Sequence, residues 1–501
     1  MILTSLILIL LATGLVAWLS ESISEGAPKW IAAIGLVVAW LPLQPLLSGL
    51  DLSLQQSWLI NEIYPWIPRF NISIHLALDG LSLLLVALTL SMGLIAVMAA
   101  WKEVKQRQGF FYFNLLWSIA GVIGVFCALD LFLFFVLWEV MLVPMYLLIA
   151  IWGYENRRYA AMKFFLFTQA GGLLMLLSIA VLALLHYQQS GQLSFDYIDL
   201  LQHQLSETAS FWVMLGFFIA FAIKLPIVPF HNWLPDAHTQ APTAVSVILA
   251  AVLLKTGGYG IIRFVLPMFP EASIEIAPYV MSIAGVSIIY GALMAFSQQD
   301  LKRLVAYSSV SHMGFVLLGC FAFTSLAWQG AVFQMLAHGV STSALFALVG
   351  AIQFRYHTRD LNKLGGLWQS VPRLSAVGLF FVAASLGMPG LGNFVAEFLV
   401  LVGSFTKYPT YTIIAASGLI LAAIYSLTIA QKTFFGPLKL EQAIDLDKRE
   451  VAMMLSMVLL LLYMGLHPQP MLDLAQQTLD RFPIATSPSI TTSTTIAGVV
   501  K

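Results

Sequence analysis

Apolar runs of about twenty residues recur from one end of the chain to the other. A helix of that length crosses the hydrocarbon core of a bilayer, and the runs are continuous rather than alternating, which excludes a membrane barrel. Only 10% of the 501 residues are charged and the mean hydropathy is +0.89. Soluble proteins carry about 25% charged residues. The sequence therefore predicts an all-α polytopic membrane protein with about fourteen transmembrane helices.

The predicted spans follow one another with mostly short connections. The first has no basic residue before it, so we interpret it as a retained helix and not as a signal peptide. The longest connection, residues 50–78, is rich in aromatic residues and proline and is expected to lie at a membrane interface. The spans are residues 1–20, 29–49, 79–101, 110–128, 131–152, 161–186, 211–230, 241–265, 277–297, 304–324, 328–354, 374–405, 411–434 and 450–467.

Lysine and arginine are distributed unevenly between the two sides of this arrangement. The odd-numbered loops contain seventeen of the 24, whereas the even-numbered loops, in which we count Arg263, and the two tails contain five. Lys224 and Lys255 fall inside predicted spans. Because basic loops stay in the cytoplasm, the sequence predicts that both termini lie on the outer side of the membrane.

Residues 218–238 combine an apolar span with Lys224, Pro226 and Pro229. A lysine at bilayer depth costs roughly 2.5–3.5 kcal/mol, so it usually faces a bundle interior or water. Pro226 removes a backbone donor, and we expect the helix to kink or break there. A charge beside a helix break is typical of an ion path in a transporter. A proline-kinked span whose lysine reaches the membrane interface fits the same residues.

An internal repeat accompanies this break. Residues 218–226 (FIAFAIKLP) are echoed 163 residues later by residues 381–389 (FVAASLGMP), so that Pro389 corresponds to Pro226. Five predicted spans separate the two starts, and the second copy should therefore run in the opposite direction. Inverted repeats with a broken helix in each half are the architecture of many transporters.

Six ionisable residues lie inside predicted spans, where each is costly unless it faces protein or water. Acids and bases are spread over both halves, so a charge that moves at one group can release or capture a proton at the next, as in a proton relay. An acid–base pair can also be a structural clamp, and each histidine can be a structural group. The six are Glu139, Lys224, Lys255, His312, His338 and Glu397.

Glu103 stands at a helix end among lysines, and we interpret it as an interface residue that could also give access to Glu139. His231, Asp236 and His238 resemble metal ligands, but their loop context favours a hydrogen-bonded cluster at a helix end.

We predict no metal site and no cofactor site in this chain. A P-loop, a CxxC motif and a glycine-rich nucleotide fingerprint are all missing from the sequence, and Cys127 and Cys320 sit in apolar runs. Energy must therefore come from partners or from an ion gradient, and nucleic acid is not an expected ligand.

Several segments together carry a family resemblance. They are residues 137–144 (LWEVMLVP), 224–242 (KLPIVPFHNWLPDAHTQAP), 253–260 (LLKTGGYG), 298–316 (QQDLKRLVAYSSVSHMGFV) and 386–398 (LGMPGLGNFVAEF). The chain resembles the antiporter-like, proton-pumping membrane subunits of respiratory complex I, NADH:quinone oxidoreductase. It is most similar to the bacterial M-type chain, chain 4, because related subunits commonly carry lysine where this sequence has Glu397.

The resemblance implies a fourteen-helix fold with two inverted five-helix repeats, each containing one broken helix. The implied parts are residues 1–109 (three helices and the interfacial loop), 110–268 (first repeat), 269–436 (second repeat) and 437–501 (a loop, the last helix and a tail).

The resemblance also implies a central hydrophilic axis along which protons cross the membrane. Glu139 and Lys224 would be the coupling pair of the first half, and Lys255 the central relay. His312 and His338 would lead to Glu397, the exchange site of the second half.

In such a complex NADH, FMN, iron–sulfur clusters and quinone would be bound by other subunits. The partners would be other membrane-arm subunits, including two related antiporter-like chains, in a bacterial inner membrane with both termini periplasmic. A cation/proton antiporter subunit of the Mrp type shares the fold and is the alternative. A non-transporting scaffold is a third reading, although a scaffold has no reason to bury these charges.

Overall fold

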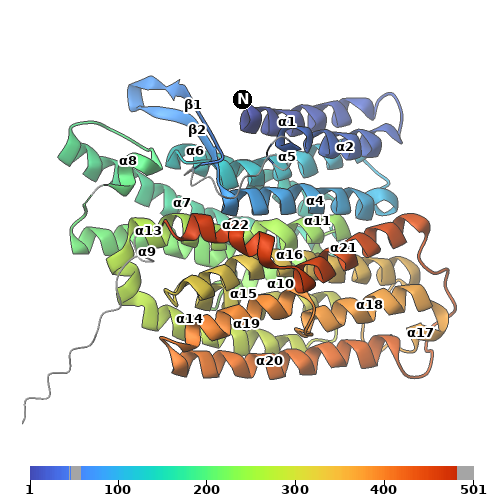
Figure 1. Ribbon diagram of the computed structural model, residues 1–501. Coiled ribbons are helices and arrows are strands. Elements are labelled where there is room, and N and C mark those ends of the chain that lie inside the picture. The colour runs from blue at the N-terminus through green and yellow to red at the C-terminus, as the bar shows by residue number, and fades with distance from the viewer. Residues whose placement is uncertain (45, 47–57, 203, 482–501) are drawn as a thin grey trace, which may run out of the picture.

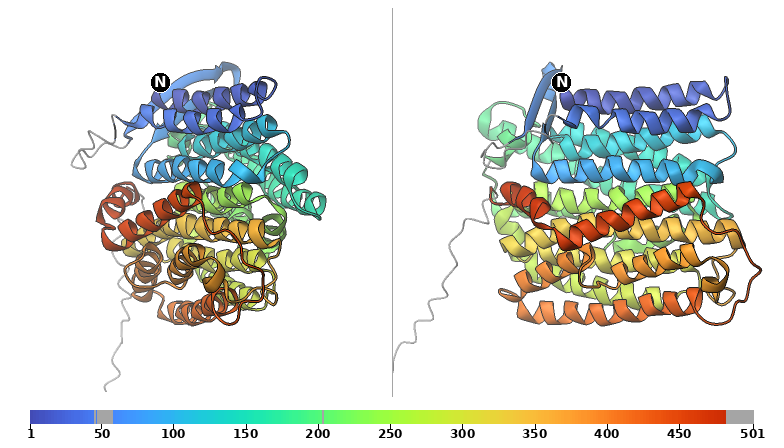
Figure 2. Two further views of the ribbon diagram at one scale, coloured as in Figure 1. Left: turned by 90° about the vertical axis from the view of Figure 1, so that its right-hand side faces the viewer. Right: turned by 45° about the vertical axis from the view of Figure 1, so that its right-hand side comes forward.

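The computed structural model describes residues 1–44, 46, 58–202 and 204–481, so residues 50–57 of the predicted interfacial connection and the tail 482–501 lie outside the described residues. Long helices run side by side in one bundle, with the N-terminal helices at one edge and α20 at the opposite edge (Figures 1 and 2).

The N-terminal part and the first half contain helices of very different lengths and one hairpin. They are α1 (Ile2–Ser20), α2 (Ala27–Val38), η1 (Leu41–Leu43), β1 (Ile60–Ile67), η2 (Pro68–Phe70), β2 (Ile72–Leu78), α4 (Gly80–Glu103), α5 (Gln108–Cys127), α6 (Leu131–Trp152), α7 (Arg157–Ser190), α8 (Tyr197–Leu201), α9 (Glu207–Lys224), η3 (Phe230–Asn232), α10 (Trp233–Gln240), α11 (Thr243–Ile248), η4 (Leu249–Leu253), α12 (Leu254–Gly260), η5 (Ile261–Val265) and α13 (Leu266–Met268).

The remainder of the described chain forms helices that are joined by loops. It comprises α14 (Pro270–Phe296), α15 (Leu301–Cys320), α16 (Ser325–Tyr356), α17 (Leu367–Ser370), α18 (Pro372–Ser385), α19 (Gly392–Phe405), α20 (Pro409–Ile429), η6 (Ala430–Phe434), α21 (Lys448–Leu466) and α22 (Gln469–Leu479).

Eleven helices of the described residues are long and apolar enough to cross a membrane, and three more apolar helices are shorter. This confirms an all-α polytopic membrane protein, while the number fourteen stays a prediction. The helices Thr243–Met268 and Ser325–Tyr356 are the most enclosed, with 100% and 94% of their most apolar windows buried, against 28% for α1. The core therefore lies around these two helices, which carry Lys255 and His338.

A β-hairpin is the feature that the sequence did not predict. β1 and β2 pair antiparallel, with an irregularity next to Pro65. The proline and the aromatic residues around it obscure the alternation that marks a strand. Glu62 on β1 accepts hydrogen bonds from the backbone N–H groups of Leu3 and Thr4 at 3.0 and 3.2 Å, which ties the start of the chain to the hairpin.

α6 and α15 begin in the same way. Asp130 accepts hydrogen bonds from two N–H groups of the first turn of α6 at 2.9 and 3.0 Å, and Asp300 does the same for α15 at 2.8 and 3.1 Å. Each aspartate also forms an isolated antiparallel bridge with a later one, Asp196 and Asp360 respectively.

These matching helix starts lie at opposite ends of the bundle. Asp130 accepts a hydrogen bond from Ser73 of the hairpin, which directly precedes α4. Asp300 pairs with Arg359, whose guanidinium lies 5.1 Å from the Tyr154 ring centroid beside the other end of α4. Opposite placement of one local structure supports the inverted repeat, and the repeat boundaries stay predictions.

The chain breaks at both predicted prolines. α9 ends at Lys224, two residues before Pro226, and α18 ends at Ser385, four residues before Pro389. In the second break Gly387 and Gly390 adopt φ values of 80° and 92°, a backbone region that side chains other than glycine rarely occupy. The helix Thr243–Met268 is irregular in another way, because two π-helical segments, η4 and η5, flank α12 and its Lys255.

Candidate functional site

Lys255 and His338 meet at the centre of the bundle. Lys255 Nζ lies 2.7 Å from His338 Nδ1 and donates to the Ala250 carbonyl at 2.5 Å. Both side chains are fully buried. A lysine ammonium can only donate, so His338 accepts at Nδ1 when Lys255 is charged and then carries its own proton on Nε2. No partner of that Nε2 is present among the described residues.

His312 and Glu397 form the next contact along the same axis. His312 Nδ1 lies 2.8 Å from Glu397 Oε1, and Gln334 Nε2 donates to the same oxygen at 3.1 Å. The His312 and His338 rings lie 5.6 Å apart, centroid to centroid. The structure therefore brings four of the six predicted relay residues into one buried row, in the order Lys255, His338, His312, Glu397.

Glu139 and Lys224 are arranged differently. Within the described chain they form no ion pair at 4.0 Å or less, although each acts electrostatically on the other. Lys224 Nζ instead lies 5.0 Å from the Trp138 ring centroid and 5.4 Å from that of Phe164. Glu139 is half-buried, with Gln169 Nε2 at 3.4 Å from its carboxylate. The two residues of the predicted coupling pair are near one another but not in contact.

Glu103 lies at the end of α4, and its hydrogen bonds go to residues other than Glu139. Both carboxylate oxygens accept from the Thr243 N–H, at 3.1 and 3.0 Å, and one accepts from the Tyr154 hydroxyl at 3.1 Å. Glu103 thus caps α11, the start of the helix that carries Lys255. These partners lie on α11 and in the connection after α6, and among the described residues no hydrogen bond joins Glu103 to Glu139.

A cavity of about 580 Å³ opens beside Glu103, between the ends of α4, α16 and α21. Its wall includes apolar side chains together with charged groups from α4, from α21 and from the connections that follow α4 and α16. These charged and titratable groups are Lys102, Glu103, Lys105, Tyr154, His357, Arg449 and Glu450. The cavity therefore brings a polar surface to the point where the α11 helix begins.

Lys302 was counted as a loop residue, yet its side chain turns inward and is 1% exposed. Its Nζ donates to the Ala241 carbonyl at 2.5 Å and lies 5.3 Å from the Tyr154 ring centroid. Arg359 lies against the same ring. Lys302, Arg359 and Glu103 thus surround Tyr154, which is itself part of the cavity wall.

The predicted hydrogen-bonded cluster of His231, Asp236 and His238 is wrong. His238 is fully buried and stacks on Phe346 with ring centroids 4.4 Å apart. The ring nitrogens of both histidines have no hydrogen-bond partner among the described residues. Asp236 turns to Lys163 instead, at 2.6 Å. In the described part of the chain no group of three or more His, Cys, Asp and Glu side chains is placed to hold a metal ion.

Arg263 was counted with the loop residues, but in the structure it lies in a helix. It belongs to η5, and it forms an ion pair with Asp79, the N-cap residue of α4. Both side chains are only 3% exposed. Arg263 was counted with the loop charges because the sequence alone does not show that a carboxylate from another helix neutralises the guanidinium.

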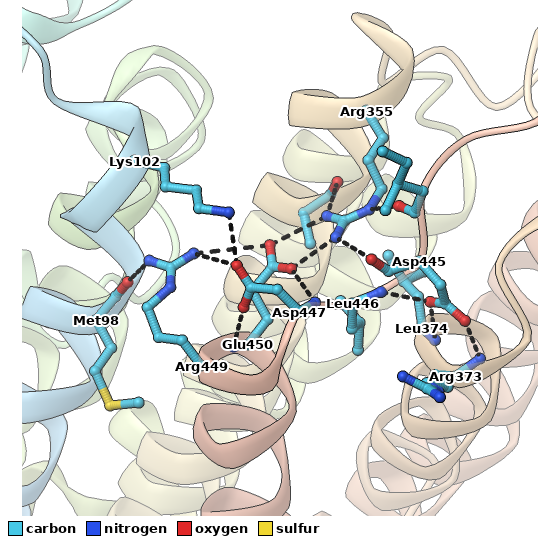
Figure 3. A network of polar contacts seen from close by, with 12 residues as sticks. Met98, Lys102, Arg355, Arg373, Leu374, Asp445, Leu446, Asp447, Arg449 and Glu450 are labelled. Carbon is cyan, nitrogen blue, oxygen red and sulfur yellow. Dashed lines mark hydrogen bonds and ion pairs between the residues drawn. The ribbon is translucent and has the colours of Figure 1, made fainter.

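A network of ion pairs closes one side of the cavity (Figure 3). Arg355 at the end of α16 donates to both oxygens of Glu450 on α21, at 3.1 and 2.6 Å. Lys102 on α4 donates to Asp447 at 2.7 Å, and Arg449 reaches the Met98 carbonyl. The network joins three helices that are far apart in the sequence.

Asp447 also caps α21, and its surroundings favour the charged form. Partial burial raises the pKa of its carboxyl, but hydrogen bonds from Lys102 and from the Glu450 N–H lower that pKa further, so that it lies below the ordinary value. Asp447 and Glu450 form a reciprocal capping box in which each accepts from the other's backbone N–H.

Comparison with known proteins agrees with this geometry. The family described as NADH:quinone oxidoreductase/Mrp antiporter, TM, matches residues 128–424. NADH-quinone oxidoreductase subunit M from Pseudomonas aeruginosa is 50% identical over 493 residues, which cover 95% of this chain and 96% of that protein.

Solved structures show the same similarity. A chain of respiratory complex I from Thermus thermophilus with bound NADH is 32% identical, with a TM-score of 0.86, over 97% of this chain and 100% of that chain. A chain of the Mrp complex from Dietzia sp. DQ12-45-1b has a TM-score of 0.81 over 96% of this chain and 52% of that chain, but at 21% identity it shows the fold alone. The chain therefore belongs to the subunit M family of NADH-quinone oxidoreductase, the antiporter-like, proton-translocating membrane subunits.

Proposed function

We propose that this chain moves protons along the buried row Lys255, His338, His312 and Glu397. The observation that carries the proposal is the row itself, in which each of two contacts is shorter than 3 Å and every member is at most 3% exposed. Four ionisable side chains are buried at such cost only if they pair with one another or carry ions.

The chemistry of the row follows from its donors and acceptors. A proton that passes from Lys255 Nζ to His338 Nδ1 leaves a neutral amine and an imidazolium. The imidazolium can then release its Nε2 proton toward His312 and Glu397. In the described chain no hydrogen bond joins the two imidazole rings, so this is the step of the row at which a change elsewhere can interrupt transfer.

In the first half we propose that Glu139 and Lys224 act as a separable pair. The aromatic faces of Trp138 and Phe164 give the Lys224 ammonium a place to reside without the carboxylate, since a cation over an aromatic ring is attracted by about 0.5–2 kcal/mol. Movement of Lys224 toward or away from Glu139 would change the field at Lys255.

We propose that protons reach the row from the cavity beside Glu103. Lys302 lies below Tyr154, and His238 lies within electrostatic range of both Lys302 and Lys255. Tyr154, Lys302 and His238 therefore supply polar atoms between the cavity and the row. In this proposal Glu103 gives access to Lys255 and not to Glu139.

The wider setting is also proposed. The chain would work as a non-redox subunit among other membrane-arm subunits, including two related antiporter-like chains, in a bacterial inner membrane with both termini periplasmic. NADH, FMN, iron–sulfur clusters and quinone would be held by those other subunits. Quinone reduction there would reach this chain as a change of charge or conformation at Glu139.

The test compares Glu397→Gln and Lys255→Met in the purified complex, reconstituted in vesicles. We expect each to abolish proton pumping linked to this chain while the complex stays assembled. Exposed Glu275→Gln and Lys432→Met are matched controls that should pump normally. Wild-type pumping by assembled Glu397→Gln would refute the proposal, and sodium transport by the complex would favour the Mrp-type alternative.

A further inference from the structure

Tyr425 presents a hydroxyl group to the row from a helix that otherwise contributes little to the interior. Only 39% of the most apolar window of its span, Pro409–Phe434, is buried. Tyr425 is nevertheless fully buried, and its hydroxyl lies 3.0 Å from His312 Nε2. A tyrosine hydroxyl in such a position usually has a partner for which it is placed.

The two nitrogens of His312 face partners of different chemistry. Nδ1 faces Glu397, which as a carboxylate can only accept, so Nδ1 carries a proton whenever Glu397 is charged. Nε2 faces Tyr425, whose hydroxyl can either donate or accept. When His312 is neutral, Tyr425 donates its proton to the lone pair on Nε2. When His312 gains a proton at Nε2, the new N–H donates to the Tyr425 oxygen after the hydroxyl rotates.

We propose that Tyr425 is a positioning residue of the relay, which keeps His312 hydrogen-bonded in both of its protonation states. The inference rests on the proposed function of the row. It also explains why a hydroxyl and not a carbonyl or an ammonium faces Nε2, since a group that could only accept or only donate would favour one state and hold the proton there.

The other groups around His312 set the charge that Tyr425 must accommodate. Glu397 on α19 and His338 on α16 are the titratable groups that contact or face the ring, and Gln334 adds a neutral donor to Glu397. α14 packs along another side of α15 through Ile288 and Gly291, which carry no charge.

The test is Tyr425→Phe, which removes one oxygen and keeps the ring. Hydrogen bonds that involve a charged group are about twice as strong as neutral ones. Loss of the hydrogen bond from Tyr425 therefore destabilises the protonated form of His312 more than the neutral form. We expect the alkaline limb of the pumping profile to move to lower pH by about half a unit to one unit, with pumping at pH 8 reduced several-fold. Tyr411→Phe on the same helix is the matched control and should leave the profile unchanged.

A second variant carries 3-fluorotyrosine at position 425, which keeps the shape and makes the hydroxyl a weaker acceptor. It should move the limb in the same direction by a smaller amount. Wild-type pH profiles in both variants would refute the role of Tyr425, as would a loss of pumping that is equal at every pH and parallels a loss of thermal stability. If Glu397→Gln abolishes pumping in the same experiment, the row stands and only the inference about Tyr425 fails.

Discussion

The ion pair between Arg355 and Glu450 offers a quantitative test of what holds the end of the bundle together. The side chains are 8% and 10% exposed, and the guanidinium makes two hydrogen bonds to the carboxylate. Removing one partner of a buried pair costs about 3–5 kcal/mol because the other charge is left without compensation. The nearby cavity lets water reach the site, so we expect about 3 kcal/mol for Arg355→Met.

A double-mutant cycle separates the pair from its surroundings. Arg355 also donates to the carbonyls of Ile444 and Asp445 at 2.7 and 3.1 Å, and Glu450 also accepts from the Asp447 N–H at 2.9 Å. Each single variant loses these contacts as well, at about 1 kcal/mol for each hydrogen bond. Because the contacts are lost again in the double variant, they cancel, and we expect a coupling energy of about 2 kcal/mol.

The assay is unfolding of the detergent-solubilised full chain by SDS, followed by circular dichroism, for the wild type, Arg355→Met, Glu450→Met and the double variant. We expect the double variant to be more stable than the sum of the single losses indicates. Losses that add to within about 0.5 kcal/mol would show that Arg355 and Glu450 do not stabilise the bundle as a pair within the network of Figure 3.

Two further predictions use the same assay. The pKa of Asp447 is lowered in the folded chain, so its contribution to stability is present above the ordinary value of 3.8 and is lost as pH falls through the folded pKa. Asp447→Asn should flatten the acid side of the stability profile, and an unchanged slope below pH 4 would contradict this. A Cβ at Gly257 would lie 2.6 Å from the Phe221 carbonyl oxygen, so Gly257→Ala should destabilise the chain by about 1–3 kcal/mol, whereas Gly26→Ala, with open space around it, should not.

The membrane fold could be predicted because hydropathy reports burial in lipid directly. The positions of the helix breaks followed from Pro226 and Pro389, whose effect on a helix is local. Glu397 and Lys255 stood out for the same reason, since an ionisable group in an apolar run is costly wherever the rest of the chain lies. These features depend on the residues themselves and little on their partners.

What could not be predicted depends on partners from distant parts of the chain. Arg263 was counted as a loop residue because its neutralising partner, Asp79, comes from a distant part of the chain. The direction of Lys224 toward two aromatic rings, and not toward Glu139, is set by how α6, α7 and α9 pack. Tyr425 gave no signal at all, because a tyrosine in a membrane helix is common and inexpensive.

The proposed relay residues are in contact in the second half of the molecule but not in the first. In the second half His312 and Glu397 are in hydrogen-bonding contact and joined through His338 to Lys255, whereas in the first half Lys224 is separated from Glu139. A proton passes directly only between groups in hydrogen-bonding contact, and such contacts have heavy-atom distances of about 2.7–3.2 Å. In the proposed relay, Lys255 and His338 can therefore exchange a proton without moving, whereas Lys224 must first leave the two aromatic rings before it can exchange one with Glu139.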